Sequence, residues 1–170
     1  YLNRKKSLND ILENFFKNSW EAMIIIWTDL ENSLESVKIA KQNKNIFVTI
    51  WIHPCDIWKL DLEETIEKLE NIYKENKEKI VAIWEIWLDY YRIEKDSEKF
   101  FESWKIKDKQ KYISETKIKQ KYFFEAQINL AKKLNLPIVI HNRESKDDIF
   151  EILKKLDFKN FVFHCFSENL

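Results

Sequence analysis

Length, composition and charge limit the classes to which this chain can belong. Its 170 residues, 45% of them apolar, can bury one substantial core, but a complete eight-stranded β/α barrel needs about 250 residues. No apolar run approaches the roughly 18 residues that cross a membrane, and the amino terminus resembles no signal peptide, so we expect no membrane partner. The net charge is zero, with 29 basic and 29 acidic side chains, so any affinity for nucleic acid must be local.

Short apolar runs alternate with segments of helical period along the chain. The expected helices span residues 7–16, 32–40, 61–73, 123–134 and 145–156. The expected strands, short and apolar on both faces, span residues 22–26, 46–52, 80–86, 138–140 and 161–163. Strands of this kind, separated by helices, are typical of a parallel sheet covered by helices, so we predict an α/β fold. No glycine-rich phosphate loop occurs, which argues against a doubly wound nucleotide-binding fold.

The segment from about residue 93 to residue 116 interrupts this alternation. Because it is rich in Lys and Glu, we interpret it as a solvated, partly helical insertion on the surface. A basic arm that touches substrate is the alternative, and the sequence leaves both open.

The cysteines bear on the cellular compartment. Only two occur, Cys55 and Cys165, and they are far apart and match no zinc spacing. This usage suits a reducing environment better than a disulfide scaffold, so we expect a cytoplasmic protein.

All three histidines follow expected strands: His53, His141 and His164. Glu85 lies at the same end of the strand that begins at Ile80. In a parallel barrel the carboxyl ends of the strands carry the catalytic groups. Because neighbouring strands lie about 4.8 Å apart, Glu85, His141 and His164 can converge on one ion. Imidazoles with a carboxylate suit zinc, iron or manganese, whereas a site with few histidines would suit magnesium better.

One histidine at a strand end is more often a hydrogen-bonded rim residue, but three of three favours a metal site. Glu85 supports this interpretation, because it lies inside the otherwise apolar run from residue 80 to residue 88. A buried carboxylate without a partner costs on the order of several kcal/mol, so a cation must lie nearby. Arg143 and a metal ion are the two candidates.

Four segments carry a resemblance to one family: Ile52–Pro54, Ala82–Tyr91, Pro137–Arg143 and Phe163–Ser167. Together they closely resemble the signature blocks of the TatD family of metal-dependent deoxyribonucleases. They follow the family's order and spacings, apart from the insertion after Tyr91. The resemblance implies a partial TIM-type (β/α) barrel that holds strands two to six of eight, as a single incomplete barrel domain.

The resemblance also implies the chemistry. Glu85, His141 and His164 match ligands of a dinuclear site, which would hold two divalent metal ions (Mg, Mn or Zn). Glu85, His53 and Arg143 would be catalytic residues, the last two as contacts to substrate. The implied reaction is hydrolysis of phosphodiester bonds of DNA by metal-activated water, exonuclease-like and from the 3′ end. We expect a monomer that acts on single-stranded DNA or on duplex ends.

The chain departs from the family pattern at both ends. The family's first metal ligands, an H-x-H pair on strand one, would precede residue 1, and a late aspartate ligand would follow Leu170. We therefore expect a fragment that is inactive by itself.

A second departure concerns glycine, which is absent although an average usage of about 7% predicts roughly a dozen. Tryptophan, normally rare, occurs seven times. The family has glycine at the positions of Trp20, Trp27, Trp51, Trp84 and Trp87, where a helix stops or backbone approaches a ligand. We hypothesise that the organism reads the UGA codon as glycine where the translation assigned tryptophan. The alternative is a diverged protein whose genuine tryptophans crowd the mouth of the site.

Metal ligation alone does not name a substrate. One alternative function is that of a barrel amidohydrolase acting on small-molecule amides or esters. Another is that of a catalytically inactive barrel acting as a binding module.

Overall fold

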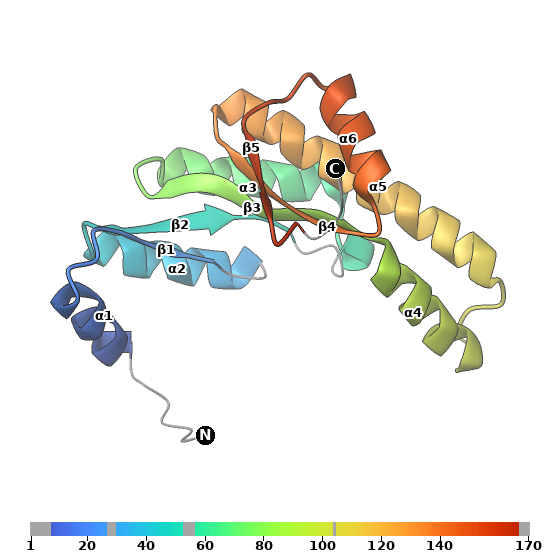
Figure 1. Ribbon diagram of the computed structural model, residues 1–170, viewed down its shortest axis with the longest axis horizontal. Helices are drawn as coiled ribbons and strands as arrows, with labels where there is room; N and C mark the ends of the chain where they lie inside the picture. Colours follow the sequence, from blue (N-terminus) through green and yellow to red (C-terminus); the bar gives the residue numbers. More distant parts are fainter. Residues whose placement is uncertain (1–7, 27–29, 53–56, 104, 167–170) are drawn as a thin grey trace.

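The computed structural model describes residues 8–26, 30–52, 57–103 and 105–166. Within them, parallel strands form one sheet in chain order (Figure 1). They are β1 (Met23–Ile25), β2 (Ile46–Ile50), β3 (Ile80–Asp89), β4 (Ile138–Arg143) and β5 (Phe161–His164). Each pair of neighbours is parallel and linked through at least one helix, which confirms the predicted α/β fold.

The helices are α1 (Leu8–Lys17), α2 (Leu30–Gln42), α3 (Leu62–Glu75), α4 (Tyr90–Glu102), α5 (Lys109–Leu134) and α6 (Lys146–Lys155), with a 3-10 turn η1 (Ile57–Lys59). Local capping explains where α3 begins: the Asp61 side chain accepts a hydrogen bond of 2.9 Å from the Glu64 N–H. No helix of the described residues has both the length and the apolar character to span a membrane.

The two central strands are longer than predicted. The ladder between β3 and β4 continues beyond Glu85, pairing Trp87 with His141 and Asp89 with Arg143. His141 therefore lies within β4 and not in the loop that follows, and Glu85 lies within β3 at a register shift of the ladder. The expected boundaries at residues 86 and 140 were too early: β3 continues to Asp89, and the polar residues at the end of β4 resemble loop residues in sequence.

The segment of residues 93–116 is largely helical. It comprises most of α4 and the start of α5, each opened by an aspartate cap: Asp89 accepts from the Arg92 N–H at 2.8 Å, and Asp108 from the Lys111 N–H at 2.9 Å. Figure 1 shows α4 leading away from the carboxyl end of β3 and α5 returning along the sheet. That this segment is an insertion stays a prediction.

The core lies between the sheet and its covering helices. Isoleucines of the central strands, among them Ile83, Ile86 and Ile140, are fully buried together with Phe124 and Ile128 of α5. Burying each such side chain contributes roughly 1.5–3 kcal/mol. This packing makes β3 and β4 a rigid base for the side chains at their carboxyl ends.

Candidate metal centre

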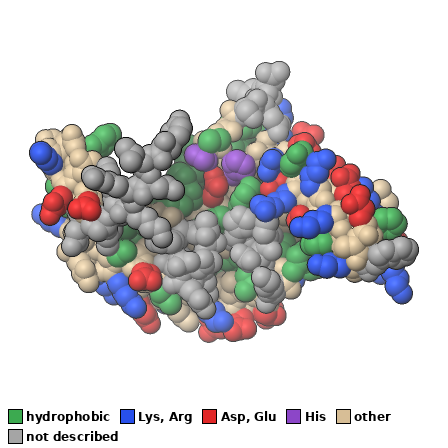
Figure 2. Space-filling view, turned by 90° about the horizontal axis from the view of Figure 1, so that it is seen from below, with side chains coloured by type: hydrophobic (Ala, Val, Ile, Leu, Met, Phe, Trp, Pro, Cys, Tyr) green, Lys and Arg blue, Asp and Glu red, His purple; other side chains and the backbone are tan. Residues whose placement is uncertain are grey.

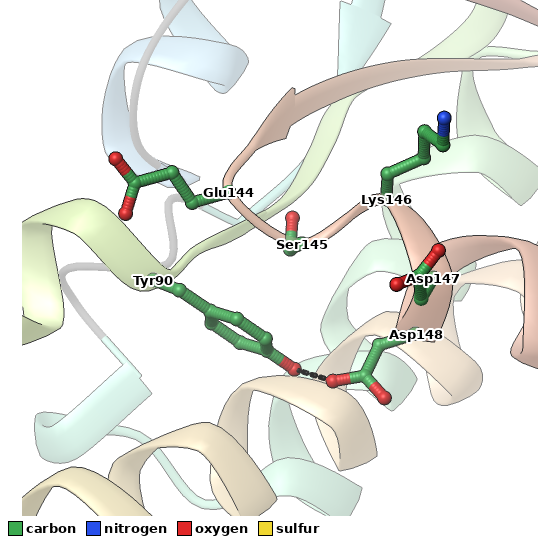
Figure 3. A pocket seen from close by; sticks show the side chains of 6 residues that line it. All are labelled: Tyr90, Glu144, Ser145, Lys146, Asp147 and Asp148. Atoms are coloured by element: carbon green, nitrogen blue, oxygen red, sulfur yellow. Dashed lines mark hydrogen bonds between the residues drawn. The ribbon is translucent and has the colours of Figure 1, made fainter. Parts of the chain in front are cut away.

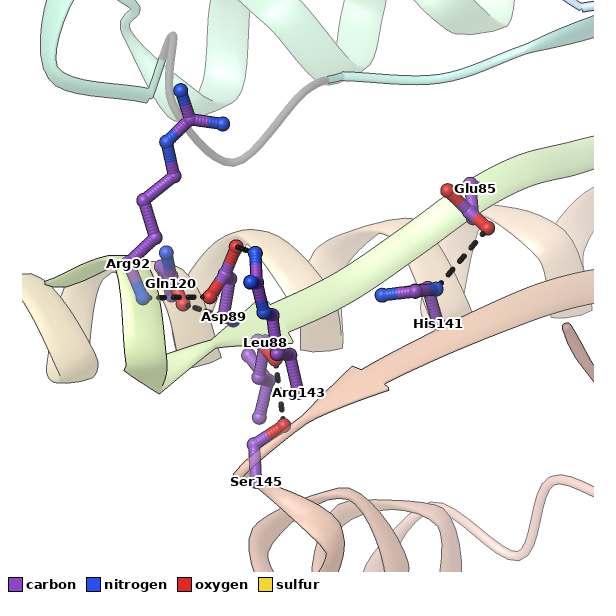
Figure 4. A network of polar contacts seen from close by, with 8 residues as sticks. All are labelled: Glu85, Leu88, Asp89, Arg92, Gln120, His141, Arg143 and Ser145. Carbon is purple, nitrogen blue, oxygen red and sulfur yellow. Dashed lines mark hydrogen bonds and ion pairs between the residues drawn. The ribbon is translucent and has the colours of Figure 1, made fainter. Parts of the chain in front are cut away.

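Glu85, His141 and His164 converge at the carboxyl end of the sheet. His141 and His164 are directly paired residues of β4 and β5, and Glu85 lies at a register shift of β3 between Trp84 and Ile86. One ligand atom from each lies within 4.8 Å of the others. Oε1 of Glu85 is 2.6 Å from Nδ1 of His164 and 3.5 Å from Nδ1 of His141. Figure 4 shows Glu85 and His141 pointing toward one another from adjacent strands.

The polar atoms of this cluster have the character of metal ligands. Oε1 of Glu85 and Nδ1 of His141 are buried, and among the described residues neither forms a hydrogen bond of acceptable geometry. Buried polar atoms normally have a partner, so a group without one requires a reason. A cation between a carboxylate and two imidazoles would satisfy all three, and this donor set suits zinc or manganese. The residues present therefore fit a divalent metal ion.

The cluster is open to solvent on one side. The side chains of Glu85, His141 and His164 are 15%, 23% and 44% exposed, which is enough for a substrate to reach them. Figure 2 shows both histidines at the surface beside a carboxylate. The same view shows Lys and Arg side chains gathered on the flank that leads toward α4 and α5. The thiol of Cys165, an exposed residue, lies 3.3 Å from Nε2 of His164.

Indole rings pack against both histidines. The Trp84 ring is 5.4 Å from that of His164, and the Trp87 ring is 4.8 Å from that of His141. Trp51 is 3% exposed, and the centre of its ring lies 6.5 Å from that of Trp87. Trp20, by contrast, is 64% exposed on the surface. Trp27 lies outside the described residues. The hypothesis that these positions are glycine stays a prediction, and the indoles at two of them do narrow the site.

Arg143 pairs with Asp89 and not with Glu85. Its Nη1 is 3.8 Å from Oδ2 of Asp89, the directly opposite residue of β3 (Figure 4). The guanidinium carbon also lies 4.2 Å from the centre of the Tyr91 ring. Asp89 is only 1% exposed, whereas the Arg143 side chain is 46% exposed. Of the two cations expected as partners for Glu85, Arg143 is therefore engaged elsewhere, and the metal ion stays a prediction.

His53, the remaining predicted site residue, lies outside the described residues. Its role stays a prediction.

The sequence analysis did not identify several residues that support the site. Two buried glutamines of α5 hold strand ends: Oε1 of Gln120 accepts from the Asp89 N–H at 3.0 Å, and Oε1 of Gln127 from the Ile52 N–H at 3.2 Å. Ser145 Oγ donates to the Leu88 carbonyl at 2.6 Å and so ties the end of β4 to β3. The two glutamines lie seven residues apart, which places them on the same buried face of α5. That spacing could have predicted their burial from the sequence.

A second polar cluster lies beside α6. The Tyr90 hydroxyl donates to the Asp148 carboxylate, which Lys121 also contacts at 2.7 Å (Figure 3). Burial and the neighbouring Asp148 raise the pKa of Tyr90 above its ordinary value. Burial by itself raises the pKa of Asp148, but the bonds from Lys121 and Tyr90 outweigh it and hold that pKa below the ordinary value. Three carboxylates line the adjoining open pocket, so it is unsuited to phosphate.

Comparison with known proteins agrees with this geometry. An uncharacterized metal-dependent hydrolase of Mycoplasma genitalium is 30% identical over 86% of this chain and 49% of its own length. The 3′-5′ ssDNA/RNA exonuclease TatD of Shigella flexneri is 26% identical over 95% of this chain and 54% of its own length. The chain spans about half the length of the relatives it matches.

The fold matches about half of a solved structure. The crystal structure of YjjV, a TatD homologue from Escherichia coli, superimposes with a TM-score of 0.68 at 23% identity, covering 93% of this chain and 53% of that one. The sequence profile of the TatD related DNases matches residues 2–170. The chain belongs to the TatD related DNase family.

Proposed function

We propose that this protein is a hydrolase that uses divalent metal ions to cleave phosphodiester bonds of DNA, as an exonuclease acting from the 3′ end. The observation that carries the proposal is the convergence of Glu85, His141 and His164 on one point, with ligand atoms within 4.8 Å of one another. Family membership supports it, since a relative bears the name of a 3′-5′ exonuclease for single-stranded DNA and RNA.

Each residue has a distinct part in this proposal. Glu85, His141 and His164 hold the ions, and the carboxylate orients them because its Oε1 faces both imidazoles. Two bound divalent cations would supply an ionised water near neutral pH and positive charge for the phosphate oxygens. Trp84 and Trp87, if they are tryptophan in the native protein, restrict how closely a phosphate can approach the histidines.

Arg143 contacts the substrate in this proposal. It follows His141 by two residues on β4, so both side chains leave the same face of the strand about 6.6 Å apart. The buried Asp89 carboxylate and the Tyr91 ring hold its guanidinium in place, which leaves the exposed edge for a phosphate oxygen. His53, which follows β2 in the sequence, is a further substrate contact in this proposal.

One observation favours a second candidate, a binding module without catalysis. Two indoles pack directly against the histidines, and they narrow the space in which a scissile phosphate would lie.

The test begins with metal binding to the chain itself. Isothermal titration with Mn²⁺ and Zn²⁺ is expected to show binding that Glu85→Gln and His141→Ala each weaken at least tenfold, a typical loss on removing a ligand or its support. Glu151→Gln, an exposed carboxylate of α6, is the matched control. Equal binding by all variants would refute the metal centre.

Hydrolysis is then assayed with protein purified from its native host. Metal-supplemented protein is expected to release nucleotides from the 3′ end of single-stranded DNA, and to leave small amides and esters intact. Turnover of the small substrates alone would indicate the amidohydrolase, and metal binding with no turnover of any substrate would indicate the binding module.

A further inference from the structure

A narrow groove of about 100 Å³ runs between α4 and α5. Arg92, Asp96 and Phe100 of α4 line it on one side and Tyr112 of α5 on the other, with Trp58 of η1 at its mouth. These residues form what we call the α4–α5 groove. Its volume equals that of roughly three liquid waters, so it admits the edge of a flat ring and excludes a folded domain or a duplex.

Aromatic rings line the α4–α5 groove from both helices. Trp58 stacks on Tyr112 with ring centres 5.9 Å apart and planes inclined by 20°, and Phe100 meets Tyr112 edge-on at 5.8 Å. The Trp58 side chain is 46% exposed although it is large and apolar. An exposed indole fixed by a second ring is a platform on which a planar ligand can stack.

Cations flank this platform. Nζ of Lys119 lies over the Trp58 ring at 5.1 Å from its centre, so a base that stacks there takes its place, and Arg92 lines the groove. Among the described residues neither Lys119 nor Arg92 forms an ion pair, whereas nearby Glu94 and Glu98 are neutralised by Lys117 and Lys109. Two positive charges beside an exposed ring are thus available to a ligand that carries both flat rings and negative charge.

The carboxylates of the groove restrict where that negative charge can lie. Asp89 is buried at its inner end, and Asp96 lines its wall. A phosphate inside the groove would be repelled by Asp96, whereas one on the rim would meet Arg92 and Lys119. The groove itself therefore accommodates the uncharged ring of the ligand.

The α4–α5 groove and the candidate metal centre both lie toward the carboxyl end of β3. Asp89 lines the groove and also ends β3, four residues after Glu85. Beside it, Arg143 lies over Tyr91 and faces the carboxyl end of the sheet. Figure 4 shows Arg92 and Arg143 together at one end of β3, with Glu85 and His141 further back along the strands. A chain of phosphates leaving the metal centre would meet Arg143 first and then the groove.

We propose that the α4–α5 groove binds an unpaired stretch of the nucleic-acid strand whose end lies in the metal centre. One base stacks on Trp58, and its flanking phosphates contact Arg92 and Lys119. The proposal rests on the proposed function and adds to it a stacking site for one base, which a duplex cannot use because its bases are already stacked and paired.

Fluorescence anisotropy with a labelled ten-residue oligothymidylate tests this in EDTA, where no hydrolysis occurs. Trp58→Ala is expected to weaken binding about tenfold, and Trp58→Phe to restore most of it because a flat ring remains. Arg92→Gln and Lys119→Gln are each expected to reduce the slope of log affinity against log salt by about 1. Asp96→Asn is expected to tighten binding. Trp20→Ala, an exposed indole of the amino-terminal region, and Lys38→Gln on α2 are the matched controls.

The outcomes separate this proposal from the proposed function. Unchanged binding in Trp58→Ala, Arg92→Gln and Lys119→Gln overturns the groove, even if Glu85→Gln still abolishes metal binding. Equal affinity for the oligothymidylate and for a duplex of the same length also overturns it. Loss of oligothymidylate binding in the groove variants supports it, whether or not native protein hydrolyses DNA.

Discussion

Oε1 of Glu85 and Nδ1 of His164 lie 2.6 Å apart, yet the carboxylate atom is buried without a hydrogen bond of acceptable geometry among the described residues. The same carboxylate oxygen faces Nδ1 of His141 at 3.5 Å. Each Nδ1 either donates a hydrogen bond to the carboxylate or, in the other tautomer, is free to bind a cation. If the cluster binds a divalent cation, as proposed, the stability of the chain depends on metal.

We expect Mn²⁺ or Zn²⁺ to raise the melting temperature of the chain, because an ion that binds only the folded state stabilises it. At a free metal concentration one hundred times Kd the gain is about 2.7 kcal/mol. Differential scanning calorimetry measures the shift. Glu85→Gln is expected to lose it, whereas Glu151→Gln keeps it. A shift of the same size in Glu85→Gln would contradict the assignment of this carboxylate as a ligand.

The sequence anticipated the sheet and the convergence of this site for physical reasons. Parallel strands buried on both faces are runs of apolar residues, and a histidine after such a run falls at the sheet edge where the other strands end. His141 and His164 are indeed directly paired on β4 and β5. The register shift of β3 beside Glu85 was not predictable, because the residues around it are as apolar as those of a regular strand.

The bounds of α4 were not predicted, although its segment was expected to be partly helical. Many Lys and Glu side chains surround its buried residues Tyr90, Ile93 and Ser97, so the segment was interpreted as solvated surface. The sequence also did not predict that Arg143 pairs with Asp89, because the two residues become neighbours only through the register of β3 and β4.

Gln127→Leu is expected to destabilise the chain by about 1–3 kcal/mol, because it leaves the buried Ile52 N–H without its acceptor at the end of β2. Urea unfolding followed by circular dichroism measures the change. Gln110→Leu, an exposed position at the start of the same helix, provides the comparison and is expected to stay within about 0.5 kcal/mol of the parent chain. Equal stability of the two variants would show that the glutamine bond to β2 contributes nothing.

Arg143→Gln is expected to weaken both folding and substrate binding. The Arg143 side chain is 46% exposed, but the Asp89 carboxylate that it contacts at 3.8 Å is 1% exposed, so the variant leaves a buried carboxylate without its cation and the melting temperature falls. Affinity for single-stranded DNA in EDTA is expected to fall about tenfold with loss of a charge-assisted phosphate contact. Arg143→Lys keeps the charge but loses the planar stack on Tyr91, and it is expected to recover only part of the affinity. An unchanged affinity in Arg143→Gln would exclude this residue from the substrate path.

Asp148→Asn is expected to lower stability at pH 7 by about 1 kcal/mol, since the neutral amide weakens the bonds with Lys121 and Tyr90. The folded pKa of Asp148 is depressed below its ordinary value of 3.8. Its stabilising effect is therefore complete above 3.8 and disappears as the pH falls through the lower folded pKa. Urea unfolding of both proteins between pH 7 and pH 2.5 should show their difference shrinking at the acid end. A difference independent of pH would assign the effect to packing.

The identity of residues 84 and 87 decides whether the metal centre is open. Trp84 packs at 5.4 Å on His164, and Trp87 at 4.8 Å on His141, so glycine at both positions would remove the rings that now cover both imidazoles. We expect the tryptic peptide Ile80–Arg92 from native-host protein to be lighter by two tryptophan-to-glycine replacements, as measured by mass spectrometry. The given sequence contains no glycine, so glycine in this peptide would show that the tryptophan codons are read as glycine in the native host. If both indoles are present, they narrow the approach to His141 and His164 in the native protein. A binding module then explains the cluster of metal-ligating residues better than a nuclease does.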